Sequence, residues 1–138
     1  MATAPVDLIR RVPLFGDLSD RELRDVANSM KERTFKAGDT VMAEGKGGVG
    51  FFVIDEGTAS VSVHGEQLRT LGSGDYFGEI ALIADIDRTA TITADGELRC
   101  YGMTFWDFRP LVEGNASIAW KLLQQMAERL KQAEKRSP

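Results

Sequence analysis

The sequence predicts a mainly β fold, an antiparallel β-roll or jelly roll with an N-terminal helix and C-terminal lid helices. Between residues 34 and 104, short runs rich in Val, Ile, Phe and Thr alternate with most of the 14 glycines, a pattern typical of short strands joined by tight turns. The connections between these runs are too short for crossover helices, which favours sequential antiparallel strands over a parallel sheet. Segments with helical periodicity flank this region and supply the predicted helices.

The predicted N-terminal helix has a clear start signal. Ser19 is followed three residues later by Glu22, the capping-box arrangement in which each side chain caps the backbone N–H of the other residue. We therefore expect an amphipathic helix from about Asp20 to Met30. Its apolar residues recur at helical spacing: Leu23, Val26, Ala27 and Met30.

The glycine-rich region contains the predicted strands. The glycine cluster between residues 44 and 50 lacks the order of a phosphate-binding P-loop, so a hairpin turn is the better interpretation. His64 falls in another predicted turn, and because it is the only histidine it indicates no metal site. The expected strands are Thr40–Ala43, Phe51–Asp55, Thr58–Val63, Gln67–Leu71, Thr89–Ala94 and Leu98–Thr104.

Two helices are expected after the last strand. The first begins near Thr104 and is disturbed by Pro110. Asn115 can cap a second, longer helix that ends near Lys135. The chain is thus expected to form one domain over residues 5–135, with no second domain. The apolar residues of the longer helix predict one apolar face: Ile118, Ala119, Leu122, Leu123, Met126 and Leu130.

Composition narrows the possible classes of function. Apolar residues make up 43% and charged residues 28% of the 138 residues, as in ordinary globular proteins. The net charge is −4 with no extended basic patch, which argues against nucleic-acid binding. No stretch approaches the roughly 18 apolar residues of a membrane span and no signal sequence is evident, so we expect a cytoplasmic protein without membrane insertion. The lone Cys100 is expected to be buried and inert.

The segment "FGEIALIADIDRTATITA", residues 77–94, carries the chemistry. Its apolar run is too short for a normal helix, so we expect a single helical turn after Gly78, whose unpaired N–H groups can bind an anion. Arg88 follows, and its planar guanidinium suits bidentate contact with a phosphate. Glu79 would repel a phosphate and instead suits a donor such as a ribose hydroxyl. Together these groups predict a site for a ribose phosphate.

Part of this segment, "FGEIALIADIDRTAT", resembles the phosphate-binding cassette of the cyclic nucleotide-binding domain family. The resemblance extends to "PLFGDLSDREL", "FKAGDTVMAEG", "GFFVIDEGTASV" and the final helix, and so covers about residues 8–132. It implies a β-roll flanked by helices that binds cAMP or cGMP, with cAMP the more expected ligand and no further cofactor. One departure is Asp87, where family members often have proline before the arginine.

The resemblance also implies roles for individual residues. Arg88 would bind the cyclic phosphate and Glu79 the ribose 2′-hydroxyl. The Thr89 hydroxyl could contact phosphate or a guanine amino group. Arg129 would lie on the lid helix, where it could stack on the base, pair with Glu79 or do neither. Further hydrogen bonds would come from the backbone of Gly78, Ile80, Ala81 and Thr89.

The function implied is a non-catalytic sensor that signals by moving its C-terminal helix. The apolar face of that helix could serve a homodimer or a partner protein, or pack on the chain's own barrel. The sequence shows no nucleophile paired with a histidine as general base, and no spacing typical of metal ligands. No catalytic or metal-binding residue is therefore assigned. The alternative is a structural or protein-interaction domain that keeps the fold without binding a nucleotide.

Overall fold

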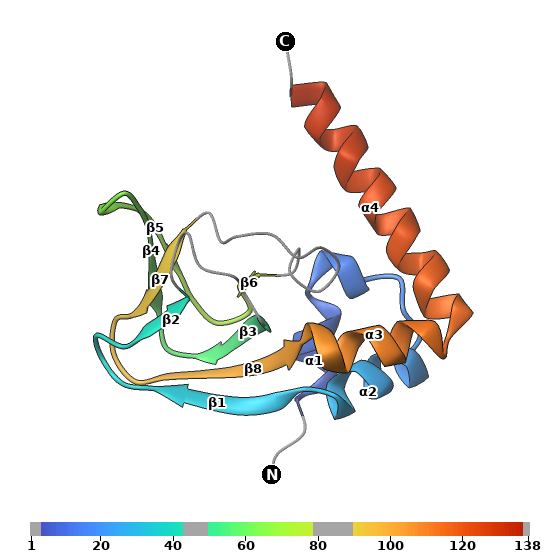
Figure 1. The fold of residues 1–138 in the computed structure, drawn as a ribbon, viewed down its shortest axis with the longest axis horizontal. Helices are drawn as coiled ribbons and strands as arrows, with labels where there is room; N and C mark the ends of the chain where they lie inside the picture. The colour runs from blue at the N-terminus through green and yellow to red at the C-terminus, as the bar shows by residue number, and fades with distance from the viewer. Residues whose placement is uncertain (1–3, 43–49, 79–89, 137–138) are drawn as a thin grey trace.

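A computed structural model of the chain describes residues 4–42, 50–78 and 90–136 (Figure 1). In these residues, two four-stranded antiparallel sheets are flanked by helices at both ends of the chain. The predicted mainly β fold, a β-roll with flanking helices, is confirmed. Among the described residues, every helix is too short or too polar to span a lipid bilayer.

The N-terminal helices pack together at one end of the first sheet. They are α1 (Val6–Arg10), the 3-10 turn η1 (Pro13–Phe15) and α2 (Asp20–Asn28). The predicted capping box is confirmed, because the Glu22 N–H donates to Ser19 Oγ at 3.2 Å and the Ser19 N–H donates to Glu22 Oε1 at 2.9 Å. The helix ends at Asn28 rather than Met30, because a strand starts at Lys31.

The first sheet has the strand order β1-β8-β3-β6, and the second has the order β2-β7-β4-β5. All predicted strands are present, Leu98–Thr104 with the predicted bounds and the others with slightly different ones, although Ala43 and Thr89 lie outside the described residues. Strand β1 was not predicted, since it is a mostly polar edge strand; β6 is only two residues long. The strands are β1 (Lys31–Phe35), β2 (Thr40–Met42), β3 (Gly50–Glu56), β4 (Ala59–Val63), β5 (Glu66–Leu71), β6 (Tyr76–Phe77), β7 (Thr91–Ala94) and β8 (Leu98–Thr104).

The core consists of two apolar clusters. One lies between the first sheet and the helices, where Phe15 meets Phe51 edge to face with ring centroids 5.8 Å apart. The other lies inside the roll and contains Ile54 and Cys100. Burial raises the pKa of the Cys100 thiol to about 12, so the thiol stays protonated near neutral pH. The expectation that Cys100 is buried is confirmed.

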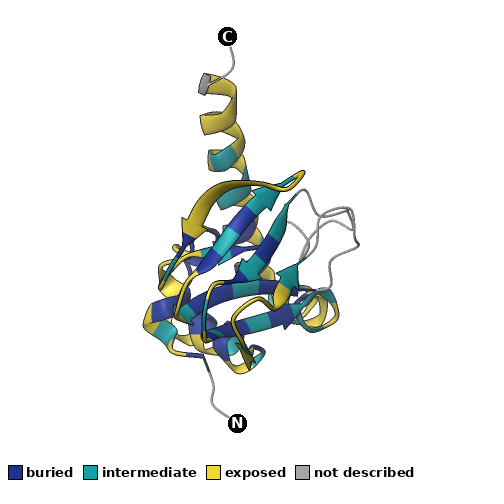
Figure 2. Cartoon of the chain, turned by 90° about the vertical axis from the view of Figure 1, so that its left-hand side faces the viewer, coloured by how far each residue is buried: buried dark blue, intermediate teal, exposed yellow. Residues whose placement is uncertain are grey.

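The C-terminal helices are α3 (Phe105–Glu113) and α4 (Ala116–Arg136). The predicted cap at Asn115 is confirmed, because the Ile118 N–H donates to Asn115 Oδ1 at 3.2 Å. Thr104 caps α3, since the Asp107 N–H donates to Thr104 Oγ1 at 3.1 Å. Helix α3 continues through Pro110. The C-terminal half of α4 projects away from the sheets (Figure 1), and exposed residues dominate it in Figure 2.

The expectation of one apolar face along α4 is wrong in part. Ile118 and Leu122 are buried against the body of the protein, as expected of a packed face. Leu123 and Leu130 are each 62% exposed and therefore belong to a different side of the helix. The error arises because residues spaced three and four apart can satisfy two adjacent stripes of one helix, and only the tertiary contacts distinguish the stripes.

The predicted turns fall partly within the described residues. His64 is an exposed residue between β4 and β5 with a φ of 53°, in agreement with the predicted hairpin turn. Of the glycine cluster at residues 44–50, only Gly50 is described, at the start of β3. The prediction for the rest of that cluster lies outside the described residues.

Candidate functional site

A cavity of about 360 Å³ lies where the second sheet, β6 and α4 come together. Ligand sites in proteins commonly have volumes of about 300–1,000 Å³, so the cavity has room for a small molecule. Its walls come from β2, β4, β5, β6, β7 and α4, that is, from both sheets and the last helix. The described residues that line it are Met42, Val61, Arg69, Leu71, Tyr76, Phe77, Gly78, Ala90, Ile92 and Arg129.

The floor of the cavity is apolar because of strand alternation. Val61 of β4 and Ile92 of β7 are Cα partners in the antiparallel ladder, so their side chains lie on the same face. Both are buried, and Leu71 of β5 extends the same surface. Such a floor suits the flat apolar faces of an aromatic ring.

Gly78 forms part of the cavity wall directly after β6. Its φ is +83°, in the left-handed region that residues with a Cβ rarely adopt. Strand β6 is held by β3, where Phe52 pairs with Phe77 and Val53 pairs with Tyr76. The backbone therefore adopts a left-handed conformation at a defined point of the cavity rim, and this conformation favours a glycine.

Arg129 lines the cavity from α4, opposite the sheet residues. Two of the predicted site residues, Gly78 and Arg129, are thus brought together from distant parts of the chain. The others lie outside the described residues: Glu79, Ile80, Ala81, Arg88 and Thr89.

Sequence reasoning missed the residues that complete the described walls, and Arg69 is the most informative of them. The described lining contains two guanidinium groups, from Arg69 and Arg129, and no carboxylate. A cavity with this balance of charge suits an anionic ligand with additional hydrogen-bond acceptors. The apolar floor residues left no separate signal, because inward-facing strand residues are apolar in any β-roll.

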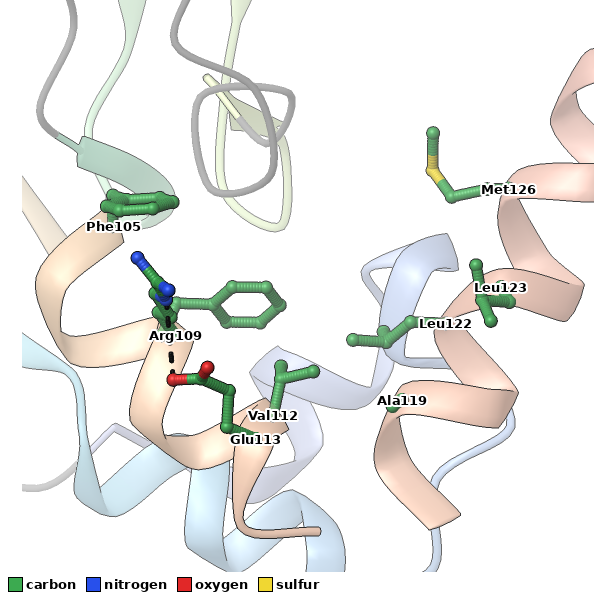
Figure 3. Close-up of a pocket in the computed structure, with 9 residues that line it drawn as sticks. Phe105, Arg109, Val112, Glu113, Ala119, Leu122, Leu123 and Met126 are labelled. Carbon is green, nitrogen blue, oxygen red and sulfur yellow. Dashed lines mark ion pairs between the residues drawn. The ribbon is translucent and has the colours of Figure 1, made fainter. Parts of the chain in front are cut away.

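A second cavity, of about 450 Å³, is a groove between α3 and α4 (Figure 3). Figure 3 shows apolar side chains of α4, such as Leu122 and Met126, facing Phe105 and Val112 of α3. The charged groups at its edge, Arg109 and Glu113, pair with each other at 3.4 Å. Of the predicted site residues that the structure describes, neither Gly78 nor Arg129 lines this groove, and its described walls do not suit an anionic ligand.

An ion pair ties the start of α4 to the N-terminal helices. Lys121 Nζ lies 2.7 Å from Glu22 Oε1, and Gln125 Nε2 donates to Asp17 Oδ2 at 2.7 Å. The hydrogen bond from Lys121, together with that from the Ser19 N–H, lowers the pKa of Glu22 to about 2. These contacts are satisfied within the protein and involve none of the described residues that line the first cavity, so they hold α4 in place rather than bind a ligand.

Across residues 4–42, 50–78 and 90–136, no group of three or more His, Cys, Asp and Glu side chains is arranged to hold a metal ion.

Comparison with known proteins gives a consistent set of relatives. The sequence model described as "Cyclic nucleotide-binding domain" matches residues 32–115. A cAMP-dependent protein kinase regulatory subunit from Yarrowia lipolytica is 37% identical over 93 residues, which are 66% of this chain and 25% of the relative. The chain therefore corresponds to about a quarter of that protein's length.

Two solved structures are similar over nearly all of the chain. The N-terminal domain of a transcriptional regulator from Streptomyces coelicolor A3(2) has a TM-score of 0.89 and 30% identity, covering 96% of this chain and 98% of that one. The cAMP-bound PfPKA-R has a TM-score of 0.69 and 26% identity, covering 94% of this chain and 46% of that one.

Proposed function

The chain belongs to the cyclic nucleotide-binding domain family, and on that premise we propose that it is a sensor module that binds a 3′,5′-cyclic nucleotide in the cavity between the second sheet and α4. The convergence of Gly78 and Arg129 on this one cavity carries the proposal. A cyclic nucleotide combines an anionic phosphate with a flat base. The cavity supplies cationic side chains and an apolar floor to match.

The sugar phosphate would bind at the part of the rim marked by Gly78. In this assignment Arg88 contacts the cyclic phosphate and Glu79 the ribose 2′-hydroxyl. Ile80, Ala81 and Thr89 add hydrogen bonds from the backbone. The left-handed φ of Gly78 supports the assignment, since a glycine lets the backbone approach a ligand closely.

Either cAMP or cGMP is a candidate ligand. The Yarrowia lipolytica relative is named as cAMP-dependent and PfPKA-R was solved with cAMP bound, so cAMP is the first ligand to test. No further cofactor is required by the proposed function. We also propose a cytoplasmic location, where cyclic nucleotides act as signals.

The proposed role is regulatory rather than catalytic. Cyclic nucleotide-binding domains and regulatory subunits are generally non-catalytic. The output would be a change in the position of α4, because Arg129 of that helix lines the same cavity as the ligand. A ligand that contacts Arg129 in only one position of α4 shifts the equilibrium toward that position.

For the partner of α4, we propose a second copy of this chain. A stripe of exposed residues, Trp120, Leu123, Ala127 and Leu130, recurs at intervals of three, four and three positions. This is the heptad spacing of a two-stranded coiled coil, and one such stripe on each copy is self-complementary. The stripe differs from the buried face of Ile118 and Leu122, so dimerisation does not require α4 to leave the body.

Calorimetric titration with cAMP and cGMP tests the proposed function. We expect saturable binding of at least one nucleotide and a rise in melting temperature. If neither ligand gives heat or stabilisation at millimolar concentration, the alternative of a nucleotide-free structural or protein-interaction domain replaces the proposal.

The variant Arg88→Ala, titrated in the same way, tests the phosphate contact assigned to Arg88. It should keep the circular dichroism spectrum of the parent chain and weaken nucleotide binding by about 2–5 kcal/mol, the usual cost of removing one partner of a desolvated charge pair. Unchanged affinity would remove Arg88 from its assigned role.

A further inference from the structure

Three residues form a row across the first sheet that ends at the wall of the first cavity. Phe52 of β3 is the Cα partner of Gly102 of β8 on one side and of Phe77 of β6 on the other. Directly opposed residues of neighbouring strands direct their side chains to the same face, here the interior of the roll. Phe77 is buried and lines the first cavity. The row therefore connects β8 with the cavity wall.

The Phe52 ring occupies the space that a side chain at position 102 would need. A Cβ placed on Gly102 would lie 2.7 Å from Cε1 and 2.9 Å from Cδ1 of that ring. Carbon atoms that are not bonded pack best about 3.5–4.0 Å apart, so the ring would have to move. The φ of Gly102 lies outside the left-handed region, so the backbone conformation does not call for a glycine. The ring that lies over Gly102 explains the glycine.

Two further aromatic rings hold the Phe52 ring in place. Phe52 stacks on Phe77 with ring centroids 5.5 Å apart and an angle of 27° between the ring planes. Phe35 meets Phe52 edge to face at 6.3 Å. Aromatic pairs at such distances attract each other beyond the area that they bury. A ring displaced from Gly102 would move away from β8, and Phe77 is its neighbour on the opposite side of the row.

Strand β6 gives Phe77 a short attachment to the sheet. The strand comprises only Tyr76 and Phe77, which pair with Val53 and Phe52 of β3. Gly78 follows directly and marks the rim of the cavity. A displacement of the Phe77 ring is therefore expected to reach the backbone of the rim within one residue.

We propose that Gly102 is a positioning residue for the cyclic nucleotide site. By leaving room for the Phe52 ring, it sets the place of Phe77 and so of the cavity rim at Gly78. The expected effect on ligand affinity rests on the proposed function. Gly102 does not line the cavity, so its influence passes through the ring of Phe52. The site thus depends on a residue that lies two strands away from its wall.

Gly102→Ala tests the inference by two measurements. Calorimetric titration should show cAMP and cGMP binding weakened by about 2- to 30-fold, the range for residues that act on a site without touching the ligand. In the protein without ligand, the amide signal of Gly78 should shift in a proton–nitrogen correlation spectrum. Gly96→Ala should change neither and is the matched control, because a Cβ on Gly96 meets no atom within 4 Å and Gly96 lies outside the cavity lining.

Phe52→Val isolates the route through the ring. Valine lacks the ring atoms that an added Cβ at position 102 would meet, and it cannot stack on Phe77. Phe52→Val alone should therefore weaken nucleotide binding within the same range. Adding Gly102→Ala to Phe52→Val should change the affinity by less than about 2-fold, because the clash that couples the two positions is gone.

The outcomes separate this inference from the proposed function. A parent chain that binds neither nucleotide overturns the proposed function, and the Gly78 signal then decides the positioning role by itself. A Gly102→Ala variant that melts earlier but keeps the parental affinity and Gly78 signal overturns the positioning role. So do losses that simply add in the double variant. If Gly102→Ala does not fold, parental affinity in Phe52→Val overturns the inference. A loss in Gly102→Ala that disappears in the Phe52→Val background supports it.

Discussion

The two halves of α4 differ in how they are held. The N-terminal half is anchored by buried Ile118 and Leu122 and by the contacts of Lys121 and Gln125 with the N-terminal helices. In the C-terminal half, Leu130 is 62% exposed and residues 131–135 are all exposed, although Arg129 reaches the cavity. One continuous helix therefore combines a buried, anchored base with a mostly exposed arm that reaches the cavity through Arg129.

The largest effect should come from adjacent leucines at the anchored end. Leu122 is 5% exposed and Leu123 is 62% exposed. Leu122→Ala leaves a cavity against the body and should lower the free energy of unfolding by about 2–5 kcal/mol. Leu123→Ala should change it by less than about 0.5 kcal/mol. Denaturant unfolding at low protein concentration measures both, and equal losses would mean that the two sides of α4 are held alike.

The Glu22–Lys121 ion pair should give a pH-dependent anchor. The folded-state pKa of Glu22, about 2, lies below the ordinary value of 4.5. Its contribution to stability is therefore complete above about pH 4.5 and is lost as the pH falls toward 2. Lys121→Met should cost about 1.5–3 kcal/mol near neutral pH, the usual worth of a hydrogen bond to a charged group.

Unfolding curves recorded between pH 2 and pH 7 measure this anchor. Glu22→Gln removes the titrating carboxylate and should flatten the fall in stability below pH 4.5. An equally steep fall in Glu22→Gln would assign the acid sensitivity to other carboxylates.

The exposed arm of α4 should affect binding more than folding. Arg129→Ala should weaken cyclic nucleotide binding by about 0.5–2 kcal/mol, the range for a cation stacked on an aromatic ring, with little change in melting temperature. Lys131→Ala, an exposed neighbour outside the cavity, is the matched control. Titration calorimetry distinguishes them, and identical affinities in the two variants would exclude a contact between Arg129 and the ligand.

The smallest effect on folding should come from the exposed stripe of α4. Leu130→Glu should leave the monomer's unfolding free energy within about 0.5 kcal/mol of the parent value. It should nevertheless shift a dimer toward monomer in sedimentation velocity, because it places like charges across the coiled-coil seam. If the parent chain is already monomeric at high concentration, the proposed dimer is wrong.

Local signals in the sequence predicted most of the fold. The capping box of Ser19 and Glu22, the cap at Asn115 and the strand runs each depend on residues within a few positions of one another, so they can be recognised without the tertiary structure. Strand β1 escaped prediction because its sequence, KERTF, is polar and lacks alternation, and its place beside β8 is set by long-range pairing.

The candidate site was predictable only in part. Gly78 could be identified from its position before a short apolar run, and Arg129 only through resemblance to a family. Arg69 gave no recognisable signal, because an arginine in a strand is ordinarily solvent-exposed and the inner face of β5 is defined by its register with β4.

By itself, the sequence determined the caps, the turns, the strand-rich class and the family, because these depend on short-range chemistry and contiguous motifs. The tertiary structure alone decided which stripe of α4 is buried, which side chain of β5 points inward, and that Arg69, Gly78 and Arg129 share one cavity. Each of these features depends on strand register or on helix docking. Both result from many weak contacts between residues that are distant in the chain.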